Sequence, residues 1–519
     1  MKTHKVLLII VAFALAKFSY GQDKAAAPFN GEKILGLYMH QHWSYNHPYA
    51  VRTWSMEDWK AFLGSLHQLG YNYALIWPML ETMPDPLTPS DSANIKKIAR
   101  VIDYAHQVLQ MKVGIVLCPN VAPNNEEAAK YTFEKRPFFH TDERVDPGDP
   151  VAFGKLMAWR EKLFLPLKEA DGVYIIDSDP GGYPNSSNLE FVYILNAHRK
   201  MLDHFRPGIE VVYWAHFGWV SYSKFYATGN LISGTVDEPR DAITLMSKQH
   251  MEPWGVASSR YGPHLADAIG MGDRVINFPY GAIEDEPSFP LTLYGGDRAT
   301  KGGSSGGERG VIGNAQSHVV QLPNIFAFAR AAQGLSISKE DYIHFADDLI
   351  PGMGIKIVEG WEALQGQDPA RMRKAAQELD VATKKTLPVG KLAGLMFNNA
   401  SRYLNDLFLQ LNMAASLYDF RKSLDGGDKS KIKMSLTLFA DAAAAWQKKH
   451  GYSSAWYWPP MSEALHRLHD PSVDAVLDEG FVAKEGDNGF DRVKKGLATM
   501  ETETPRLIEA MKGAAARMK

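Results

Sequence analysis

Short apolar, β-branched runs alternate with amphipathic helical stretches between residues 33 and 322, and this alternation restricts the possible folds more than any other feature of the sequence. Strands separated by helices predict parallel strands joined by right-handed crossovers. About eight such units over roughly 290 residues is the size of a (β/α)8 TIM barrel, an α/β fold. The apolar runs cover residues 34–40, 73–77, 112–118, 172–177, 210–216, 230–235, 253–258, 274–280 and 310–315.

The nine runs are one more than a barrel needs, so we expect one of the last three to lie outside it. An open, doubly wound sheet is the other arrangement that such alternation permits. No glycine-rich nucleotide-binding turn follows the first run, and its absence from the sequence disfavours the open sheet.

The character of the chain changes after Leu322. Residues 323–519 read as successive helices with almost no strand-like runs, so we expect a barrel over 30–322 and a C-terminal helical domain over 323–519. A Gly- and Ser-rich stretch over 296–310 predicts a mobile loop. Such a loop could be a lid beside the last strand or an exposed insertion, and the sequence favours neither.

The first 21 residues have the layout of a secretion signal. Lys2 and Lys5 precede an apolar run over 6–16, and small residues stand before a predicted cut ahead of Gln22. We therefore expect a secreted or periplasmic protein that does not enter the membrane once the signal is removed, because the apolar run is too short to span a bilayer. The single cysteine, Cys118, excludes an internal disulfide.

Aromatic, imidazole, amide and carboxylate side chains follow the predicted strands. Active sites of barrel enzymes lie at the carboxyl ends of the strands, so these residues should surround one mouth. Flat aromatic rings stack on the CH faces of sugars, which predicts a carbohydrate substrate. A net charge of −3 without clustered Lys or Arg argues against a nucleic-acid partner. The candidate substrate-binding residues are His40, His42, Trp43, Tyr45, His47, Arg52, Trp77, Glu81, Trp214, His216, Trp219, Asp237, Glu238 and Asn314. For the tryptophans, simple packing in the core is the alternative.

The fourth predicted strand ends in the sequence Asp177-Ser178-Asp179. Residues i and i+2 of a strand share a face about 6.6 Å apart. Two close carboxylates push their pKa values apart, so one can hold a proton while the other stays ionised, as glycosidic cleavage requires. Asp177 and Asp179 are therefore the predicted catalytic pair. The alternatives are a calcium loop, or a loop in which both carboxylates bind backbone amides.

A histidine pair at the end of the first predicted strand offers a different chemistry. His40 and His42, with His216, are placed as in the metal sites of amidohydrolase-type barrels. Such sites also need a histidine after the sixth strand, where the sequence has Asp237 and Glu238. We therefore predict no metal and no other cofactor, and keep a metal-dependent hydrolase as the second hypothesis.

Three stretches resemble the secreted (β/α)8 glycoside hydrolases of the hexosaminidase-like superfamily. They are TWSMEDWKAFLGSLHQLGYNYALIWPM (53–79), DPGDPVAFGKLMAWREKLFLPLKEADGVYIIDSD (146–179) and GVIGNAQSHVVQLPNIFAFARAAQG (310–334). The likeness is to family 20 and family 84 hexosaminidases, and more distantly to family 18 and the α-glucuronidases.

The resemblance implies roles for the two aspartates. Asp177 would orient the substrate acetamido group and Asp179 would be the acid/base. The paired acidic residues are adjacent in families 20 and 84 but separated by Ser178 here, so Asp237, Glu238 or Glu81 could instead be the nucleophile or base.

We therefore expect a glycosidase that acts near the end of a glycan, because long loops after the first and last strands could close a pocket. A barrel that binds carbohydrate without cleaving it is the third hypothesis.

Overall fold

The computed structural model describes most of the chain. The described residues are 33–42, 46–137, 142–178, 181–183, 186–228, 235–248, 254–258, 262–270, 272–284, 291–295, 300, 308–451, 458–479 and 489–518.

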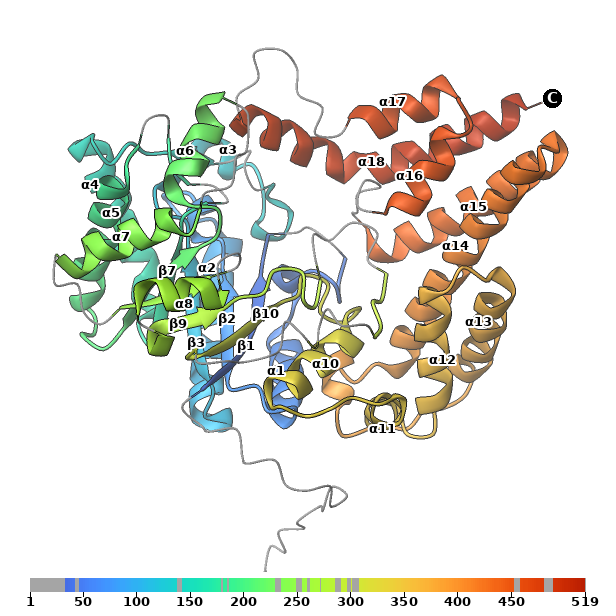
Figure 1. The fold of residues 1–519 in the computed structure, drawn as a ribbon, viewed down its shortest axis with the longest axis horizontal. Coiled ribbons are helices and arrows are strands. Elements are labelled where there is room, and N and C mark those ends of the chain that lie inside the picture. The colour runs from blue at the N-terminus through green and yellow to red at the C-terminus, as the bar shows by residue number, and fades with distance from the viewer. Residues whose placement is uncertain are drawn as a thin grey trace, which may run out of the picture.

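Eight parallel strands close into a barrel, which confirms the predicted fold class (Figure 1). Around the barrel the order is β1-β10-β9-β8-β7-β6-β3-β2. The strands are β1 (Ile34–His40), β2 (Tyr73–Trp77), β3 (Lys112–Leu117), β6 (Gly172–Ile176), β7 (Glu210–Ala215), β8 (Trp254–Ser258), β9 (Val275–Asn277) and β10 (Gly310–Asn314). A separate two-stranded sheet joins β4 (Val121–Pro123) and β5 (Asp142–Arg144).

The expectation about the surplus ninth run was wrong. All of the last three runs supply barrel strands, and the barrel closes without the run over 230–235. Residues 229–234 lie outside the described residues. Two helices, α6 (Trp219–Thr228) and α7 (Asp237–Lys248), fill the connection from β7 to β8. This long crossover leaves room for an apolar run that is not a barrel strand.

The strands are buried on both faces, as parallel strands covered by helices should be. All seven residues of β1 are buried. Strands β1 and β10 close the barrel with Ile34 opposite Gly310. A Cβ atom at Gly310 would lie 2.1 Å from the carbonyl oxygen of Ile34, so this closure requires glycine.

The helices that surround the barrel begin at clear caps. Ser55 and Asp58 form a capping box for the first helix, and Thr88 and Asp91 form one for the second. The surrounding helices are α1 (Met56–Gln68), α2 (Pro89–Tyr104), α4 (Pro150–Phe164), α5 (Asn188–Asp203), α6, α7, α8 (Gly262–Ile269) and α10 (Leu322–Ala332). Tyr71 donates its hydroxyl proton to the carbonyl of Ile325 in α10 at 2.9 Å. Helix α10 thus packs on the barrel, and we place the change to the helical domain after it rather than at residue 323.

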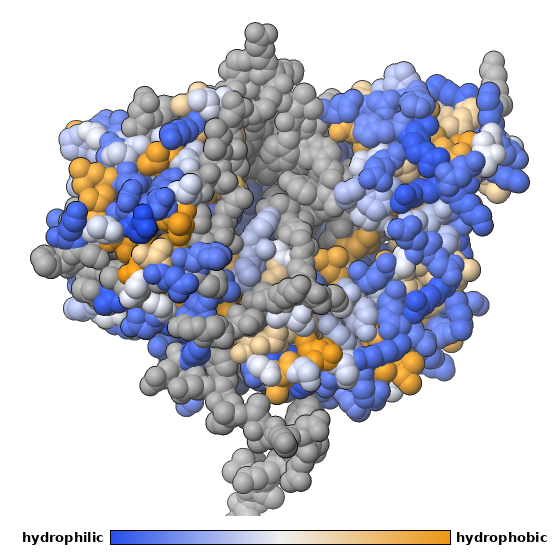
Figure 2. Space-filling view, in the orientation of Figure 1, coloured by the Kyte–Doolittle hydropathy of each residue, from blue (hydrophilic) through white to orange (hydrophobic). Residues whose placement is uncertain are grey.

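The rest of the chain is helical, as expected, and lies beside the barrel (Figure 1). Its elements are α11 (Lys339–Leu349), α12 (Gly354–Gln365), α13 (Pro369–Thr383), the short helix η7 (Ala393–Met396), α14 (Ala400–Gly426), α15 (Lys429–His450), α16 (Pro459–His466), α17 (Pro471–Glu479) and α18 (Gly489–Arg517). Hydrophilic residues dominate the visible surface of this half, because its helices bury only one side (Figure 2). Among the described helices, none has the length and apolarity to cross a membrane.

One hydrophobic core runs through both halves of the molecule. It extends without interruption from Ile34 in β1 to Ala415 in α14, and a second core joins α14 to α18. The contact is close where Gly394 of η7 meets α1, since a Cβ atom at Gly394 would lie 2.2 Å from the carbonyl oxygen of Ala61. The barrel and the helices therefore pack against each other over an apolar interface.

Residues 291–295 pass between the barrel and the helical domain. Three glutamine side chains satisfy their backbone: Gln410 accepts from the Thr292 amide at 2.7 Å, Gln365 donates to the Thr292 carbonyl at 3.0 Å, and Gln321 accepts from the Leu293 amide at 3.0 Å. Of the predicted loop 296–310, most lies outside the described residues. Arg309 pairs with Glu210 at the start of β7, so the end of this loop lies at the amino end of the barrel, opposite the mouth, which disfavours a lid there.

Candidate functional site

Three aromatic rings from different strands meet inside the barrel below its mouth. Tyr38 of β1 lies 5.2 Å from Trp214 of β7 in an edge-to-face arrangement, and Phe278, directly after β9, lies 4.3 Å from Trp214 and 5.5 Å from Tyr38. All three are buried. They form a floor of aromatic surface at the carboxyl ends of the strands, where barrel active sites lie. We refer to Tyr38, Trp214 and Phe278 as the aromatic floor.

Imidazoles stand above the aromatic floor. His40 stacks on Tyr38 at 5.1 Å and lies 6.2 Å from Trp77 and 5.7 Å from His42. Burial lowers the pKa of His42 well below its usual value, and the neighbouring His40 and Arg52 lower it further. His42 is therefore neutral at physiological pH, so one ring nitrogen can accept a hydrogen bond.

His216 occupies the opposite part of the rim. Its Nδ1 lies 3.0 Å from the Ser178 hydroxyl, and its ring contacts Trp214 and Tyr280. His42 and His216 are partly exposed, and Tyr280 is 41% exposed. These residues give the mouth both polar groups and an accessible aromatic face.

Asp177 points away from the mouth. Its Oδ2 accepts a hydrogen bond from the Tyr213 hydroxyl at 2.9 Å. Tyr213 in turn packs on Phe191 in the surrounding helix α5. Successive strand residues face opposite sides, so Tyr213 and Asp177 face the helices, whereas Trp214 and Ser178 face the barrel interior. The prediction that Asp177 contacts substrate is not supported, since its side chain is fully buried on the outer face.

The Asp177 carboxylate instead holds the turn after β7. It accepts hydrogen bonds from the backbone amides of His216 at 3.1 Å, Phe217 at 3.2 Å and Gly218 at 3.0 Å. Burial raises the pKa of Asp177 to about 6, against the opposing effects of His216 and the Tyr213 hydroxyl. Asp177 thus fixes the position of His216 through the backbone.

Glu238 supports the same turn from the other side. It accepts from the Ser221 amide at 3.0 Å and the Ser221 hydroxyl at 2.7 Å, at the start of α6. Glu238 and Asp237 lie in the first turn of α7, in the connection between β7 and β8. The expectation that they follow the sixth strand was therefore wrong. Asp237 is exposed and pairs with Arg240. None of these contacts involves the aromatic floor.

Glu81 joins the tips of two strands. It accepts the backbone amide proton of Cys118, after β3, and the indole proton of Trp77, at the end of β2, the latter at 3.2 Å. Burial raises the pKa of Glu81, although the nearby Arg160 acts in the opposite direction. Glu81 is 3% exposed and its oxygens bind protein groups, so its role here is to connect β2 and β3.

Arg52 and His47, two of the predicted substrate-binding residues, hold the first loop in place. The buried Arg52 guanidinium donates to the carbonyls of Gln41 and His42 in the first loop and to three carbonyls over 133–136. His47 Nε2 lies 2.9 Å from Asp58 in the α1 cap, and its ring packs on Phe397 of the helical domain. Neither side chain reaches the mouth, which argues against substrate contact by either.

The remaining predicted residues divide into three groups. Trp219 is fully buried and stacks on Phe191 at 5.0 Å, so it belongs to the core rather than to the rim. Asn314 shares its register with Tyr38 at the end of β10, donates to the Glu284 carbonyl at 3.2 Å, and leaves its buried Oδ1 without a hydrogen bond. Trp43, Tyr45 and Asp179 lie outside the described residues.

The sequence reasoning missed Ser178, Phe278 and Glu284. Glu284, in the connection after β9, accepts from the amides of Gln316 at 2.7 Å and Ser317 at 2.6 Å and thereby joins the seventh and eighth strand tips. The apolar run over 274–280 extends past the end of β9 at Asn277, so the run does not show that Phe278 lies beyond the strand tip. Glu284 lies outside all of the predicted strands and Ser178 between two carboxylates, so neither residue has a sequence signal of its own.

The three histidines of the metal hypothesis do not assemble into a ligand set. In the described part of the chain, no group of three or more His, Cys, Asp or Glu residues has the geometry to hold a metal ion. His40 and His42 are neighbours, but His216 pairs with Ser178 on another part of the rim. The arrangement of these residues therefore gives the metal hypothesis no support.

No family model and no curated protein matches this chain. Solved structures with a similar course of the chain include a GH138 enzyme targeting pectin rhamnogalacturonan II, with a TM-score of 0.48 and 11% identity over 87% of this chain and 68% of that one. The GH20 β-N-acetylhexosaminidase from Streptomyces coelicolor A3(2) has a TM-score of 0.32 and 10% identity over 57% of this chain and 63% of that one. The maltogenic α-amylase AmyB from Thermotoga neapolitana has a TM-score of 0.29 and 15% identity over 56% of this chain and 69% of that one.

Proposed function

We propose that this chain is a glycoside hydrolase that binds its substrate at the mouth of the barrel. The observation that carries the proposal is the aromatic floor with the partly exposed His42, His216 and Tyr280 above it. Aromatic faces suit the CH faces of a sugar ring, and a neutral imidazole such as that of His42 can bind its hydroxyl groups. The site lies at the carboxyl ends of the strands, where loop residues can supply catalytic groups.

We assign the proton-transferring role to Asp179. The described carboxylates of the rim are engaged elsewhere, because Asp177, Glu81, Glu238 and Glu284 each accept hydrogen bonds from backbone amides. Asp179 directly follows Ser178 in the sequence, and Ser178 lies 3.0 Å from His216 at the tip of the fourth strand. We further propose action near the end of a glycan, since the long first loop is held firmly beside the mouth by Arg52.

The test is a screen of the purified protein against aryl glycosides and natural oligosaccharides, with and without chelator. We expect chelator-insensitive release of one sugar, and a loss of turnover of at least ~100-fold in Asp179→Asn, as for a general acid. The matched control is Asp425→Asn, which removes an exposed carboxylate of the helical domain that pairs with Arg467 and should leave turnover unchanged. Near-wild-type turnover in Asp179→Asn would remove Asp179 from the chemistry.

A carbohydrate-binding barrel without catalysis is the second candidate. The observation that favours it is that the described rim carboxylates all have structural partners. Sugar binding measured by calorimetry, without turnover of any glycoside in the panel, would establish this alternative. Activity that is lost with chelator but survives Asp179→Asn would point instead to the histidines.

A further inference from the structure

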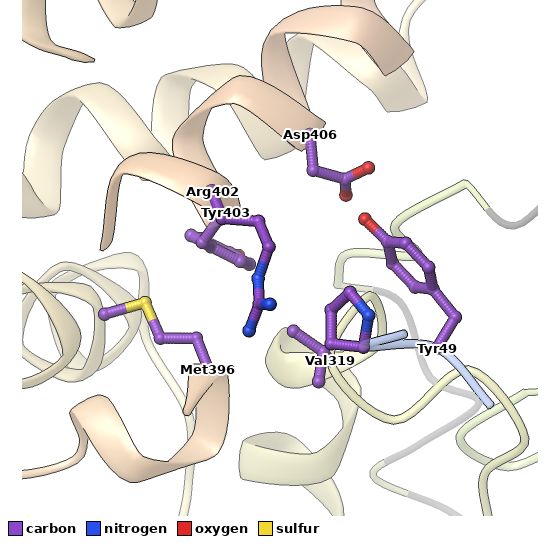
Figure 3. A pocket seen from close by; sticks show the side chains of 7 residues that line it. Tyr49, Val319, Met396, Arg402, Tyr403 and Asp406 are labelled. Carbon is purple, nitrogen blue, oxygen red and sulfur yellow. The ribbon is translucent and has the colours of Figure 1, made fainter. Parts of the chain in front are cut away.

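The helical domain holds the first loop of the barrel through its residues 46–50. The Asn46 amide donates to the His450 carbonyl at 3.1 Å, at the end of α15. The Tyr49 ring stacks on the His450 imidazole at 4.2 Å with an interplanar angle of 18°. The Tyr49 hydroxyl is hydrogen-bonded to Asp406 of α14, and the two groups face each other in Figure 3. We call Tyr49, Asp406 and His450 the loop clamp.

The loop clamp is built from polar groups that are completely enclosed. His450 lies between two rings, with Trp446 stacked on its other face at 4.6 Å, and its Nε2 lies 2.5 Å from Asp406 Oδ1. Asp406 Oδ2 also accepts from Gln410 at 2.7 Å. Apolar side chains would fill the same space equally well, because burying a polar pair such as His450 and Asp406 costs free energy. The two atoms, His450 Nε2 and Asp406 Oδ1, lie in close contact without hydrogen-bond geometry, so the pair joins α14 to α15 by a polar contact.

A short path of buried residues connects the loop clamp to the mouth. Tyr49 leads through the buried Ala50 and Val51 to Arg52. Arg52 in turn donates to the carbonyls of Gln41 and His42. A shift of Tyr49 would therefore move the arginine that fixes the backbone of His42. Tyr49 also borders a small pocket that is lined by Arg402, Tyr403 and Met396 (Figure 3).

We propose that His450 and Asp406 are positioning residues of the helical domain, which hold the first barrel loop so that His42 faces the candidate site. The consequence for turnover rests on the proposed function, whereas the consequence for the loop does not. A helical domain used in this way would be a working part of the site, although none of its residues needs to touch the substrate.

Hydrogen exchange of the full-length protein, followed by mass spectrometry, tests the effect on the loop. We expect His450→Gln to raise the exchange rate of amides over 46–52 and at His42 at least ~10-fold, because their protection depends on the local opening of this loop. Tyr49→Phe keeps the stacked ring and removes only the hydroxyl, so it should fold and give a smaller increase at the same amides. The matched control is His466→Gln, which breaks a His–Asp contact of 3.0 Å between α16 and Asp474 of α17 and should leave the loop unchanged.

Turnover provides the second readout. If the wild type cleaves a glycoside, His450→Gln should lower kcat at least ~10-fold, since a misplaced group near the site costs rate even without direct contact, and Asp406→Asn should lower it less. If His450→Gln and Tyr49→Phe both fold and show unchanged exchange at 46–52, the proposal is overturned. Faster exchange in His450→Gln with an unchanged kcat would overturn it as well. If no glycoside is cleaved by the wild type, the proposed function fails, and the exchange experiment alone decides whether the clamp holds the loop.

Discussion

At the scale of single residues, Asp177 is a buried carboxylate whose ionisation the fold opposes. Burial raises its pKa to about 6, from an ordinary value of 3.8. A raised pKa means that the folded state binds the proton more tightly than the unfolded state. The contribution of Asp177 to stability is thus fully present below pH 4 and is lost as the pH rises through 6.

We therefore predict a pH-dependent difference between the wild type and Asp177→Asn, which cannot ionise. Between pH 4 and 7, the free energy of unfolding of the wild type should fall relative to the variant by about 3 kcal/mol, the equivalent of this pKa shift. Urea denaturation at several pH values measures the difference. A difference that stays constant over this range would show that Asp177 has an ordinary pKa in the folded protein.

The sequence located Asp177 correctly at a strand tip but could not show which way it points. In a strand that is buried on both faces, apolar residues occupy both faces, so the pattern does not reveal which set faces the barrel. Tyr213 and Phe191, which fix the direction, are far from Asp177 in the sequence. The same limit applies to Trp219, whose partner Phe191 lies in another helix.

At the scale of elements, the closure of the barrel depends on the pairing of β1 with β10. Gly310 begins β10 at a φ of 154°, and a Cβ atom there would collide with the Ile34 carbonyl. The alternation of strands and helices was sufficient to predict eight strands near their observed positions. It could not identify the surplus run, because the length of a crossover is set by the helices it contains and not by the strand pattern.

We predict that Gly310→Ala destabilises the protein by at least ~3 kcal/mol, because the chain must either adopt a strained conformation or open the β1–β10 pair. The control is Gly208→Ala, since a Cβ atom at this exposed position meets nothing within 4 Å. Chemical denaturation of both variants measures the effect. Equal midpoints for the two variants would contradict the close approach of β1 and β10.

At the scale of the whole molecule, the barrel shares one hydrophobic core with the helical domain. Its helices present aromatic side chains to the helical domain, where Trp54 of the first loop lies 5.1 Å from Phe397 and Phe326 of α10 stacks on Phe345 at 4.4 Å. The sequence indicated a helical domain but not this shared core. Amphipathic helices reveal that one side is buried without revealing the partner.

We predict that a fragment covering residues 33–335 does not fold cooperatively. Removal of α11 to α14 would expose the apolar surface around Trp54 and Phe326, a patch that a stable monomer rarely shows to water. Dye binding to exposed apolar surface and near-UV circular dichroism test this prediction, with the full-length chain as the control. A single sharp thermal transition of the fragment would show that the barrel folds alone.

The glutamines around residues 291–295 also determine when the contacts of this segment can form during synthesis of the chain. The Thr292 amide finds its acceptor in Gln410, 118 residues further along the chain. A ribosome adding ~5–20 residues per second delivers that side chain roughly 6–24 s after Thr292. During this interval the Thr292 amide lacks its acceptor, whereas the Leu293 amide already has Gln321, only 28 residues along the chain. The last hydrogen bonds around residues 291–295 therefore form only after helices α12 and α14 have been synthesised.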